Sequence, residues 1–335
     1  MFPGEISEGV SRREFLAHAG AAAGAALLSP AGGWAMVKQS RVTLAESRDR
    51  RAGVVSALRA LGENPVAGKQ VLVKPNFNTA DEAPGSTHNQ TLETLVEELW
   101  RLGARSVTLG ERSYPPTREV MDAKGVLPLL EKLDVQVVDF DELGPKDWVK
   151  VTPPESHWRD GFRVARPVLE AECLVSTACL KTHQYGGVFT MALKLHVGVV
   201  PTTRHGFGYM RELHGSPHQQ EMIAEINAPF RPALVVLDGV DAFVDGGPMT
   251  GRRAAGNVVL ASADRVAIDA VGVAILKALG SNPAVMGPKI FEQRQIARAA
   301  ALGLGAASAG EIDLVAADPG SVAYRDRVAA ILAQG

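Results

Sequence analysis

Short apolar segments alternate with amphipathic segments through most of the chain after residue 36. The first pair is a buried strand over 69–74 and a helix over 89–102, whose leucines recur at the helical spacing. The same alternation predicts strands over 106–109, 135–139, 173–177, 234–237, 258–261 and 312–315, and helices over 117–133 and 265–279. Apolar strands that alternate with helices are typical of a parallel sheet covered on both faces.

One stretch departs from this alternation. Residues 148–168 have the pattern of two paired strands around Asp160-Gly161, a dipeptide that favours a hairpin turn. The predicted fold class is therefore α/β, a mostly parallel sheet with helices on both faces and a small hairpin insertion. We expect a single domain over 36–335.

The first 35 residues have the pattern of an export signal. Arg12 and Arg13 precede a mildly apolar run over 17–28, and small residues follow up to Ala35. This pattern predicts a twin-arginine (Tat) signal peptide over 1–35, cleaved after Ala35 or after Ala31. The alternative is a membrane anchor, but the run is shorter than the roughly 20 residues that span a bilayer. We expect a periplasmic protein, with the Tat translocase as its partner during export and no membrane span after cleavage.

Charge and cysteine content exclude several classes of protein. The chain has 35 basic and 37 acidic residues, and so lacks the basic excess of a nucleic-acid binder. Two cysteines are too few for a four-cysteine iron–sulphur or zinc cluster, so no iron–sulphur cluster is expected from this chain. Cys173 and Cys179, six residues apart in one extended segment, lie beyond disulfide reach and are interpreted as core thiols.

Polar side chains follow four of the predicted strands at their carboxyl ends. They are Lys74 and Asn76, then Glu111, then Lys181 and His183, and finally Asp238. In open parallel sheets ligands bind beyond this edge, where the loops converge. The pattern predicts one site, with Lys181, His183 and Glu111 as acid–base groups and the others as ligand-binding groups. The alternative is a set of surface loops in which Asn76 and Asp238 only form turns.

Gly186-Gly187 leads into a predicted helix over 188–199 that carries Lys194. A glycine-rich turn at a helix N-terminus exposes backbone N–H groups to an anion, and Lys194 would add positive charge. We therefore add Gly186, Gly187 and Lys194 to the predicted binding site for a small anionic ligand.

Five of the eight histidines lie between 183 and 218. Imidazole binds zinc, copper, iron and nickel, so a metal site is predicted from four of them. These four are His183, His196, His205 and His214. His214 and His218 have the spacing of one helix face. The spacing matches no zinc motif, and a solvated histidine-rich flap is the alternative. The cofactor stays open, with a divalent metal as one candidate.

Two groups of carboxylates complete the candidates. Asp238, Asp241 and Asp245 could hold a hard cation, although their spacing is not that of an EF-hand loop. Asp269 is a lone acid in an apolar helical stretch. A buried acid needs a partner, and a lysine of the site is the partner expected; a surface position is the alternative.

Several of these segments, taken in order, resemble the domain-of-unknown-function family numbered 362 over about 69–280. The segments are Val71-Leu72-Val73-Lys74-Pro75-Asn76, Leu180-Lys181-Thr182-His183, Thr190-Met191-Ala192-Leu193-Lys194, Asp238-Gly239-Val240, Gly247-Pro248 with Gly251, and Ala261 to Ala270. Many members have Asn after the lysine that matches Lys194, whereas this chain has Leu195. The ferredoxin-like cysteine module of some members is absent here, so the resemblance implies no electron-transfer role and no general activity.

A looser similarity is to the nickel-pincer lactate racemases. His183, Gly186-Gly187, Lys194, Pro201 and a following histidine have the order of that family's cofactor-attaching stretch, without matching its spacing. In that family a lysine holds the pyridinium-derived cofactor and histidines surround it.

Together these patterns predict a periplasmic protein with one anion-binding and possible metal-binding site at the carboxyl edge of the sheet. We favour an enzyme, because acids, bases and a histidine together exceed what anion capture requires. A lysine buried beside another cation would act as a base or nucleophile. The alternatives are a non-catalytic periplasmic metal- or oxyanion-binding protein and an accessory factor for an exported redox enzyme.

Overall fold

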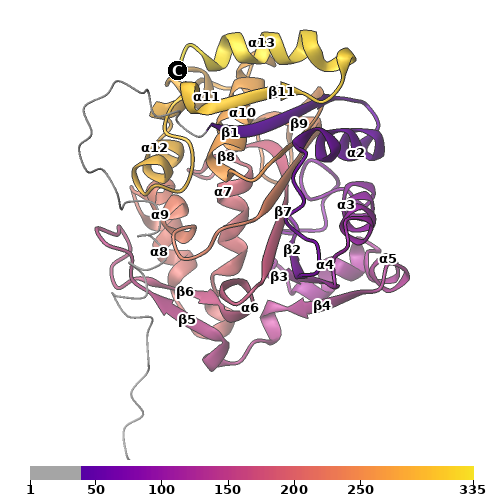
Figure 1. The fold of residues 1–335 in the computed structure, drawn as a ribbon. Helices are drawn as coiled ribbons and strands as arrows, with labels where there is room; N and C mark the ends of the chain where they lie inside the picture. Colours follow the sequence, from indigo (N-terminus) through magenta and orange to yellow (C-terminus); the bar gives the residue numbers. More distant parts are fainter. Residues whose placement is uncertain (1–38) are drawn as a thin grey trace, which may run out of the picture.

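The computed structural model describes residues 39–335, so the predicted signal peptide lies outside the described residues. The centre of the fold is a nine-stranded sheet in the order β11-β1-β10-β9-β7-β2-β3-β4, with β8 paired to β7 (Figure 1). The strands are β1 (Ser40–Glu46), β2 (Gln70–Lys74), β3 (Ser106–Glu111), β4 (Val135–Asp139), β7 (Cys173–His183), β8 (Val188–Thr190), β9 (Leu234–Gly246), β10 (Gly251–Ser262) and β11 (Ile312–Ala316).

The sheet is mostly parallel, as predicted. Strands β4, β3, β2, β7 and β9 all pair in parallel. The long β10 runs antiparallel between β9 and β1, and β11 pairs in parallel with β1 at the edge. The carboxyl ends of β2, β3 and β7 therefore meet at one edge, as the site prediction requires.

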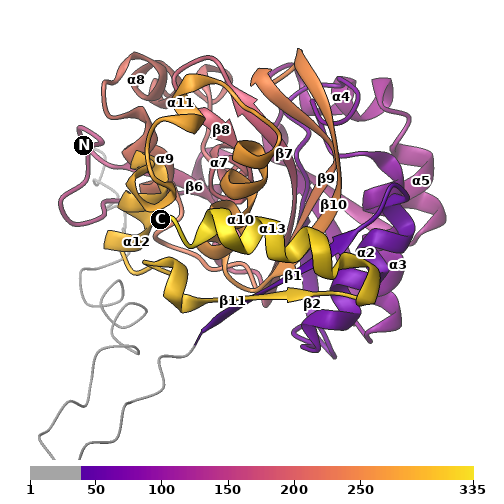
Figure 2. The ribbon, with the colours of Figure 1, turned by 90° about the horizontal axis from the view of Figure 1, so that it is seen from above.

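Helices cover both faces of the sheet, which confirms the predicted layers (Figure 2). One face carries α2 (Arg50–Leu61), α3 (Asn89–Arg101), α4 (Thr117–Ala123) and α5 (Leu127–Lys132). The other side carries α6 (Arg166–Leu169), α7 (Ala192–Leu195), α8 (Tyr209–Gly215), α9 (Gln219–Ile226), α10 (Arg265–Ala278), α11 (Pro283–Met286), α12 (Arg294–Ala301) and α13 (Val322–Leu332). Helix α10 is buried along nearly its whole length, which explains its almost uninterrupted apolar sequence.

The hairpin insertion is also present. Strands β5 (Trp148–Val151) and β6 (Phe162–Ala165) pair antiparallel in a separate two-stranded sheet. Trp148 and Phe162 are buried in a third apolar cluster together with residues of α8 and α9. The loop between the strands covers residues 152–161 and is therefore longer than a tight hairpin turn. Asp160-Gly161, expected at the centre of the turn, lies at the end of this loop, directly before β6.

Two predicted helices differ from the structure. The helix over 117–133 is two helices, separated at Gly125, whose φ of 60° favours glycine. The helix predicted over 188–199 is confirmed only from residue 192 onward. Residues 188–190 form β8 against the end of β7, α7 follows, and His196–Val199 is a 3-10 turn. Short apolar runs of this kind are compatible with either element. Residues 181–183 of β7 extend beyond its ladder with β2, and residues 188–190 pair with them as a strand.

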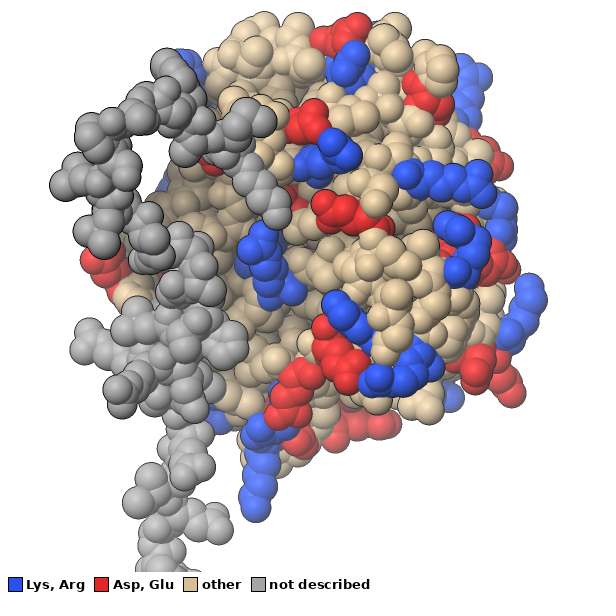
Figure 3. Space-filling view, viewed as in Figure 1, with Lys and Arg blue, Asp and Glu red and all other residues tan. Residues whose placement is uncertain are grey.

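The outer surface of the part described carries charges of both signs. Positive and negative side chains are intermingled on the face seen in Figure 3. Some form exposed pairs, such as Arg294 Nε with Glu221 Oε1 at 2.8 Å. No helix within residues 39–335 is both long and apolar enough to cross a membrane.

Candidate functional site

Lys74 and Glu111 form a buried ion pair at the ends of the neighbouring strands β2 and β3. Each is 1% exposed, and Lys74 Nζ contacts Glu111 Oε1. Lys74 Nζ also donates to the Pro75 carbonyl at 2.8 Å, while Glu111 accepts from the backbone N–H groups of Phe77 (2.9 Å) and Arg112 (2.8 Å). Burial lowers the pKa of Lys74 and raises that of Glu111, and their mutual attraction opposes both shifts. The pair is therefore a fixed part of the site.

The 3-10 turn after α7 lies directly on this pair. A Cβ atom on Gly198 would lie 2.9 Å from both Lys74 Nζ and Glu111 Oε1. The turn is held from behind by His196, whose ring nitrogens are 2.9 Å from Ser176 Oγ and 2.7 Å from Asn227 Oδ1. Glycine is thus required at 198 for the backbone to approach so closely.

Lys181 lies in β7 and is 1% exposed. Its Nζ donates to two backbone carbonyls, that of Gly85 and that of Pro248 (3.2 Å). No carboxylate within residues 39–335 forms an ion pair with it, although Asp81 attracts it from further away. Burial lowers the pKa of Lys181 to about 8.

Lys194 in α7 packs against His183 of β7 across Gly187. A Cβ atom on Gly187 would lie 2.5 Å from Lys194 Cε and 3.0 Å from His183 Nδ1. Burial, followed by the charges of Lys181 and Arg112, lowers the pKa of Lys194 to about 7. Burial and the charge of Lys194 also lower the pKa of His183, so its imidazole is neutral. His183 Nδ1 is buried and has no hydrogen-bond partner among the described residues.

Arg112 supplies a further buried cation that the sequence analysis missed. Its Nη2 donates to the Val197 carbonyl at 2.8 Å, and its Nε is buried without a partner in the described chain. Burial lowers its pKa to about 10. The sequence feature that could have identified Arg112 is its position next to Glu111 in the polar stretch after β3. The sequence pattern alone does not show that Arg112 lies near Lys194.

The buried cations Lys74, Arg112, Lys181 and Lys194 together form what we call the lysine cluster. The cluster carries more positive than negative charge, because the only carboxylate paired with any of these cations within residues 39–335 is Glu111. Asp141, which attracts Arg112 from a distance, is already paired with Arg204 at 2.8 Å. A buried cation without a counter-charge is costly, so an anion is the ligand that this arrangement favours.

The other predicted ligand-binding residues divide into two groups. Asn76 is buried beside the end of β2, and its Nδ2 has no partner among the described residues. Gly186, with φ 80°, packs against Gln219. Asp238, in contrast, accepts from Arg50 Nε (2.8 Å), Thr91 Oγ1 (2.6 Å) and the Val240 N–H (3.0 Å). It thus belongs to an ion-pair network with α2 and α3 rather than to the lysine cluster.

The four histidines predicted as metal ligands are not brought together. Within residues 39–335 no group of three or more His, Cys, Asp or Glu side chains has the geometry to hold a metal ion. His196 is engaged as described above, His205 contacts the Phe140 carbonyl at 3.2 Å, and His214 contacts the Met210 carbonyl at 2.7 Å. His214 lies in α8 while His218 precedes α9, so the expectation that they share a helix face is wrong.

Asp269 is buried, but its partner is not a lysine. It accepts from the backbone N–H groups of Ala192 (2.7 Å) and Leu193 (3.0 Å), at the start of α7. Burial raises its pKa to about 7. Its role is to fix the short helix that carries Lys194.

The loop between β7 and β8 is strained. Val188 has φ 60°, which is a rare conformation for a β-branched residue and costs on the order of 1–3 kcal/mol. Val188 pairs with His183 in the ladder between β7 and β8. Strain of this kind is concentrated at functional sites, and here it occurs beside Lys194 and His183.

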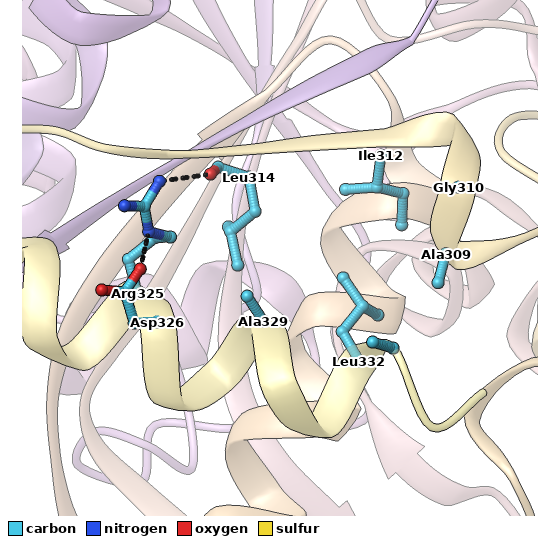
Figure 4. Close-up of a pocket in the computed structure, with 9 residues that line it drawn as sticks. Ala309, Gly310, Ile312, Leu314, Arg325, Asp326, Ala329 and Leu332 are labelled. Atoms are coloured by element: carbon cyan, nitrogen blue, oxygen red, sulfur yellow. Dashed lines mark hydrogen bonds and ion pairs between the residues drawn. The ribbon is translucent and has the colours of Figure 1, made fainter.

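A surface depression of about 640 Å³ lies elsewhere, between β11 and α13 (Figure 4). Most of its lining is apolar, and its two charged residues, Arg325 and Asp326, pair with each other at 2.6 Å. Because these two charges are already paired, the depression does not have the excess of positive charge that the lysine cluster has.

Three comparisons with known proteins bear on this chain. Residues 71–274 match the family model described as a domain of unknown function (DUF362). A thylakoid-associated protein of Synechocystis sp., sll1697, is 27% identical over 253 residues, which cover 72% of this chain and 75% of that protein. The apoprotein of lactate racemase from Thermoanaerobacterium thermosaccharolyticum superimposes with a TM-score of 0.43 and 16% identity, covering 60% of this chain and 50% of the racemase.

Proposed function

The chain belongs to the DUF362 family, and we propose that it binds a small anionic ligand at the carboxyl edge of its sheet. The observation that carries this proposal is the set of three buried cations, Arg112, Lys181 and Lys194, which have no paired carboxylate within residues 39–335. An anion would supply the missing counter-charge, and the unpartnered Nδ2 of Asn76 would add a neutral donor.

We propose further that the protein is an enzyme rather than a simple binder. A neutral imidazole at His183 and an amine at Lys194 whose pKa is about 7 are matched to proton transfer near neutral pH. Anion capture alone needs neither. Glu111 takes the role of a fixed counter-charge that holds Lys74 in place, because all its contacts are to buried donors.

Binding of simple anions tests the first proposal. We expect sulfate, phosphate and oxalate to raise the melting temperature of the full-length protein, and calorimetry to give one site. Lys181→Ala should weaken binding about tenfold or more, since a lost charge-assisted hydrogen bond costs about 1.5–3 kcal/mol. Lys277→Ala is the control, because Lys277 also donates to backbone carbonyls but lies on α10 away from the cluster. Unchanged affinity in Lys181→Ala would contradict the proposal.

We also propose that the protein is exported through the Tat translocase to the periplasm. The support is the Arg12-Arg13 pattern in the sequence, together with a relative described as thylakoid-associated. Replacing both arginines by lysine should leave the protein in the cytoplasmic fraction, whereas Lys69→Arg, a change in the surface loop before β2, should not alter its fractionation. Export of the double-lysine variant at the normal level would exclude this route.

A further inference from the structure

We propose that Lys194 forms an imine with the carbonyl carbon of a small 2-oxo acid, whose carboxylate is bound by Lys181 and Arg112. This inference rests on the anion-binding function proposed above and names its substrate class. It requires a lysine nitrogen that is not otherwise engaged, a neighbouring base, cations for the carboxylate, and access from solvent.

Lys194 differs from the other two lysines of the cluster in the state of its nitrogen. Lys74 Nζ contacts Glu111 and the Pro75 carbonyl, and Lys181 Nζ contacts two carbonyls. Lys194 makes no side-chain hydrogen bond or ion pair within residues 39–335, and it is 9% exposed. Its nitrogen is therefore the one among the three that is available to a ligand.

A base lies beside the side chain of Lys194. His183 Nδ1 and Lys194 Cε both meet the surface of Gly187, and Nδ1 has no partner among the described residues. Because burial and adjacent cations keep this imidazole neutral, it can accept a proton. The same surroundings lower the pKa of Lys194 to about 7, so a large fraction of its amine is neutral and nucleophilic at neutral pH.

The carboxylate of the substrate has two cations and a hydroxyl to bind. Arg112 Nη2 donates to the carbonyl of Val197, in the turn that directly follows α7 and its Lys194. Lys181 precedes His183 by two residues in β7, so the two side chains lie on the same face of the strand. Thr190 lies directly opposite Lys181 in the β7–β8 ladder, so their side chains are on the same face. The Thr190 hydroxyl is buried without a partner in the described residues and would serve as a further donor.

The site lies just beneath the surface. Tyr185 packs edge-on against the His183 ring, with centroids 5.8 Å apart, and is itself 54% exposed. Residues 184–186, which directly precede Gly187, are all exposed, so the loop beside His183 and Lys194 faces solvent. Gly187 lies at the end of this loop and directly precedes the strained Val188, the first residue of β8.

The chemical step is balanced without any oxidant or reductant. The neutral amine of Lys194 adds to the carbonyl carbon, and one amine proton reaches the former carbonyl oxygen through His183. The carbinolamine then loses that oxygen as water, together with the second amine proton, and leaves a carbon–nitrogen double bond. The products are one imine and one water molecule.

Reductive trapping tests the inference. The full-length protein is incubated with pyruvate and sodium cyanoborohydride, with acetone as the uncharged carbonyl control. We expect the mass increase of one reduced pyruvate adduct, peptide mapping that localises it to Lys194, and much slower reaction with acetone. Lys194→Arg keeps the positive charge but cannot form an imine, so it should abolish the adduct. Lys277→Arg should leave trapping unchanged.

The outcomes separate this inference from the proposed function. If pyruvate binds by calorimetry but gives no adduct, or the adduct maps to other lysines and persists in Lys194→Arg, the imine is excluded and the anion site stands. If neither pyruvate nor sulfate binds, both proposals fail. Mapping of the wild-type adduct decides the question even if Lys194→Arg does not fold.

Discussion

Asp269 of α10 accepts a hydrogen bond from the backbone N–H of Ala192 at 2.7 Å, and so ties the central buried helix to the short helix that carries Lys194. Its second oxygen accepts from Leu193, and Asn227 Nδ2 donates to the Leu193 carbonyl at 3.0 Å. The position of Lys194 is thus set by buried polar contacts on both sides of α7.

Asp269→Asn should weaken this connection, because both oxygens of a carboxyl group can accept a hydrogen bond whereas an amide nitrogen cannot. We expect a loss of about 1–3 kcal/mol in the free energy of unfolding at pH 6, as for other buried donors left without an acceptor. Urea unfolding of the wild type and the variant measures it.

The difference in the free energy of unfolding between the wild type and Asp269→Asn should depend on pH. The folded-state pKa of Asp269 is raised to about 7 from the ordinary value of 3.8, so folding takes up a proton between these values. The stabilisation is fully present below the unfolded pKa and is lost as the pH rises through the folded pKa. The stability difference should fall by ~1.4 kcal/mol per pH unit between pH 5 and 7 and level off above it. A difference that is constant from pH 5 to 8 would show that Asp269 does not titrate there.

Glu111→Gln should destabilise the protein strongly, because it leaves the Lys74 ammonium buried without its counter-charge. Loss of one partner of a buried ion pair costs about 3–5 kcal/mol. The double variant Lys74→Met with Glu111→Leu removes both charges and should recover most of this loss. Glu221→Gln, which breaks the exposed pair with Arg294, is the control and should cost at most about 1 kcal/mol. Equal losses in the single and double variants would mean that the charge is not the cause.

Gly198→Ala tests the close approach of the 3-10 turn to the same ion pair. The added methyl group would lie 2.9 Å from two buried polar atoms, so the turn must move or the pair must separate. We expect a loss of about 1–3 kcal/mol, as for other overpacked sites. Gly215→Ala at the end of α8 has no atom within 4 Å of the new Cβ and should change stability by less than about 0.5 kcal/mol. Similar values for the two variants would contradict the close approach.

The sequence predicts the layers of this fold well because they depend on local periodicity. The parallel strands that end at Lys74 and Glu111, and the helix that begins at Arg265, follow directly from the alternation of apolar segments. The region after His183 does not, because β8 exists through its pairing with β7 and through a positive φ at Val188 that no propensity favours. The strand Ser40–Glu46 was not predicted, although its apolar centre pairs with β10.

Site prediction failed where it depended on which way a side chain points. Lys74 of β2, Lys181 of β7 and Lys194 of α7 do lie near Arg112 or near one another, since the topology brings these elements together. Asp238 occupies an equivalent strand, yet its side chain faces α2 and meets Arg50. Arg112 was overlooked because nothing in the sequence shows that the loop after β3 folds toward α7. The periodicity of apolar residues identifies the edge of the sheet. The direction in which each side chain points depends on the twist of the strands and on the side chains packed around it.

Sulfate affinity should fall as the pH rises from 6 to 9. Lys194 and Lys181 have folded-state pKa values of about 7 and about 8, so their positive charges are lost in this range. A bound anion stabilises the charged forms, so binding should be accompanied by proton uptake near pH 7–8.

Calorimetry in buffers of different ionisation enthalpy measures the uptake, and sulfate is chosen because its own charge is constant. Lys181→Arg, which stays charged, should flatten the upper part of the profile, and Lys194→Arg the lower part. Proton release on binding, or an affinity that rises with pH, would show that these lysines are not the groups that hold the anion.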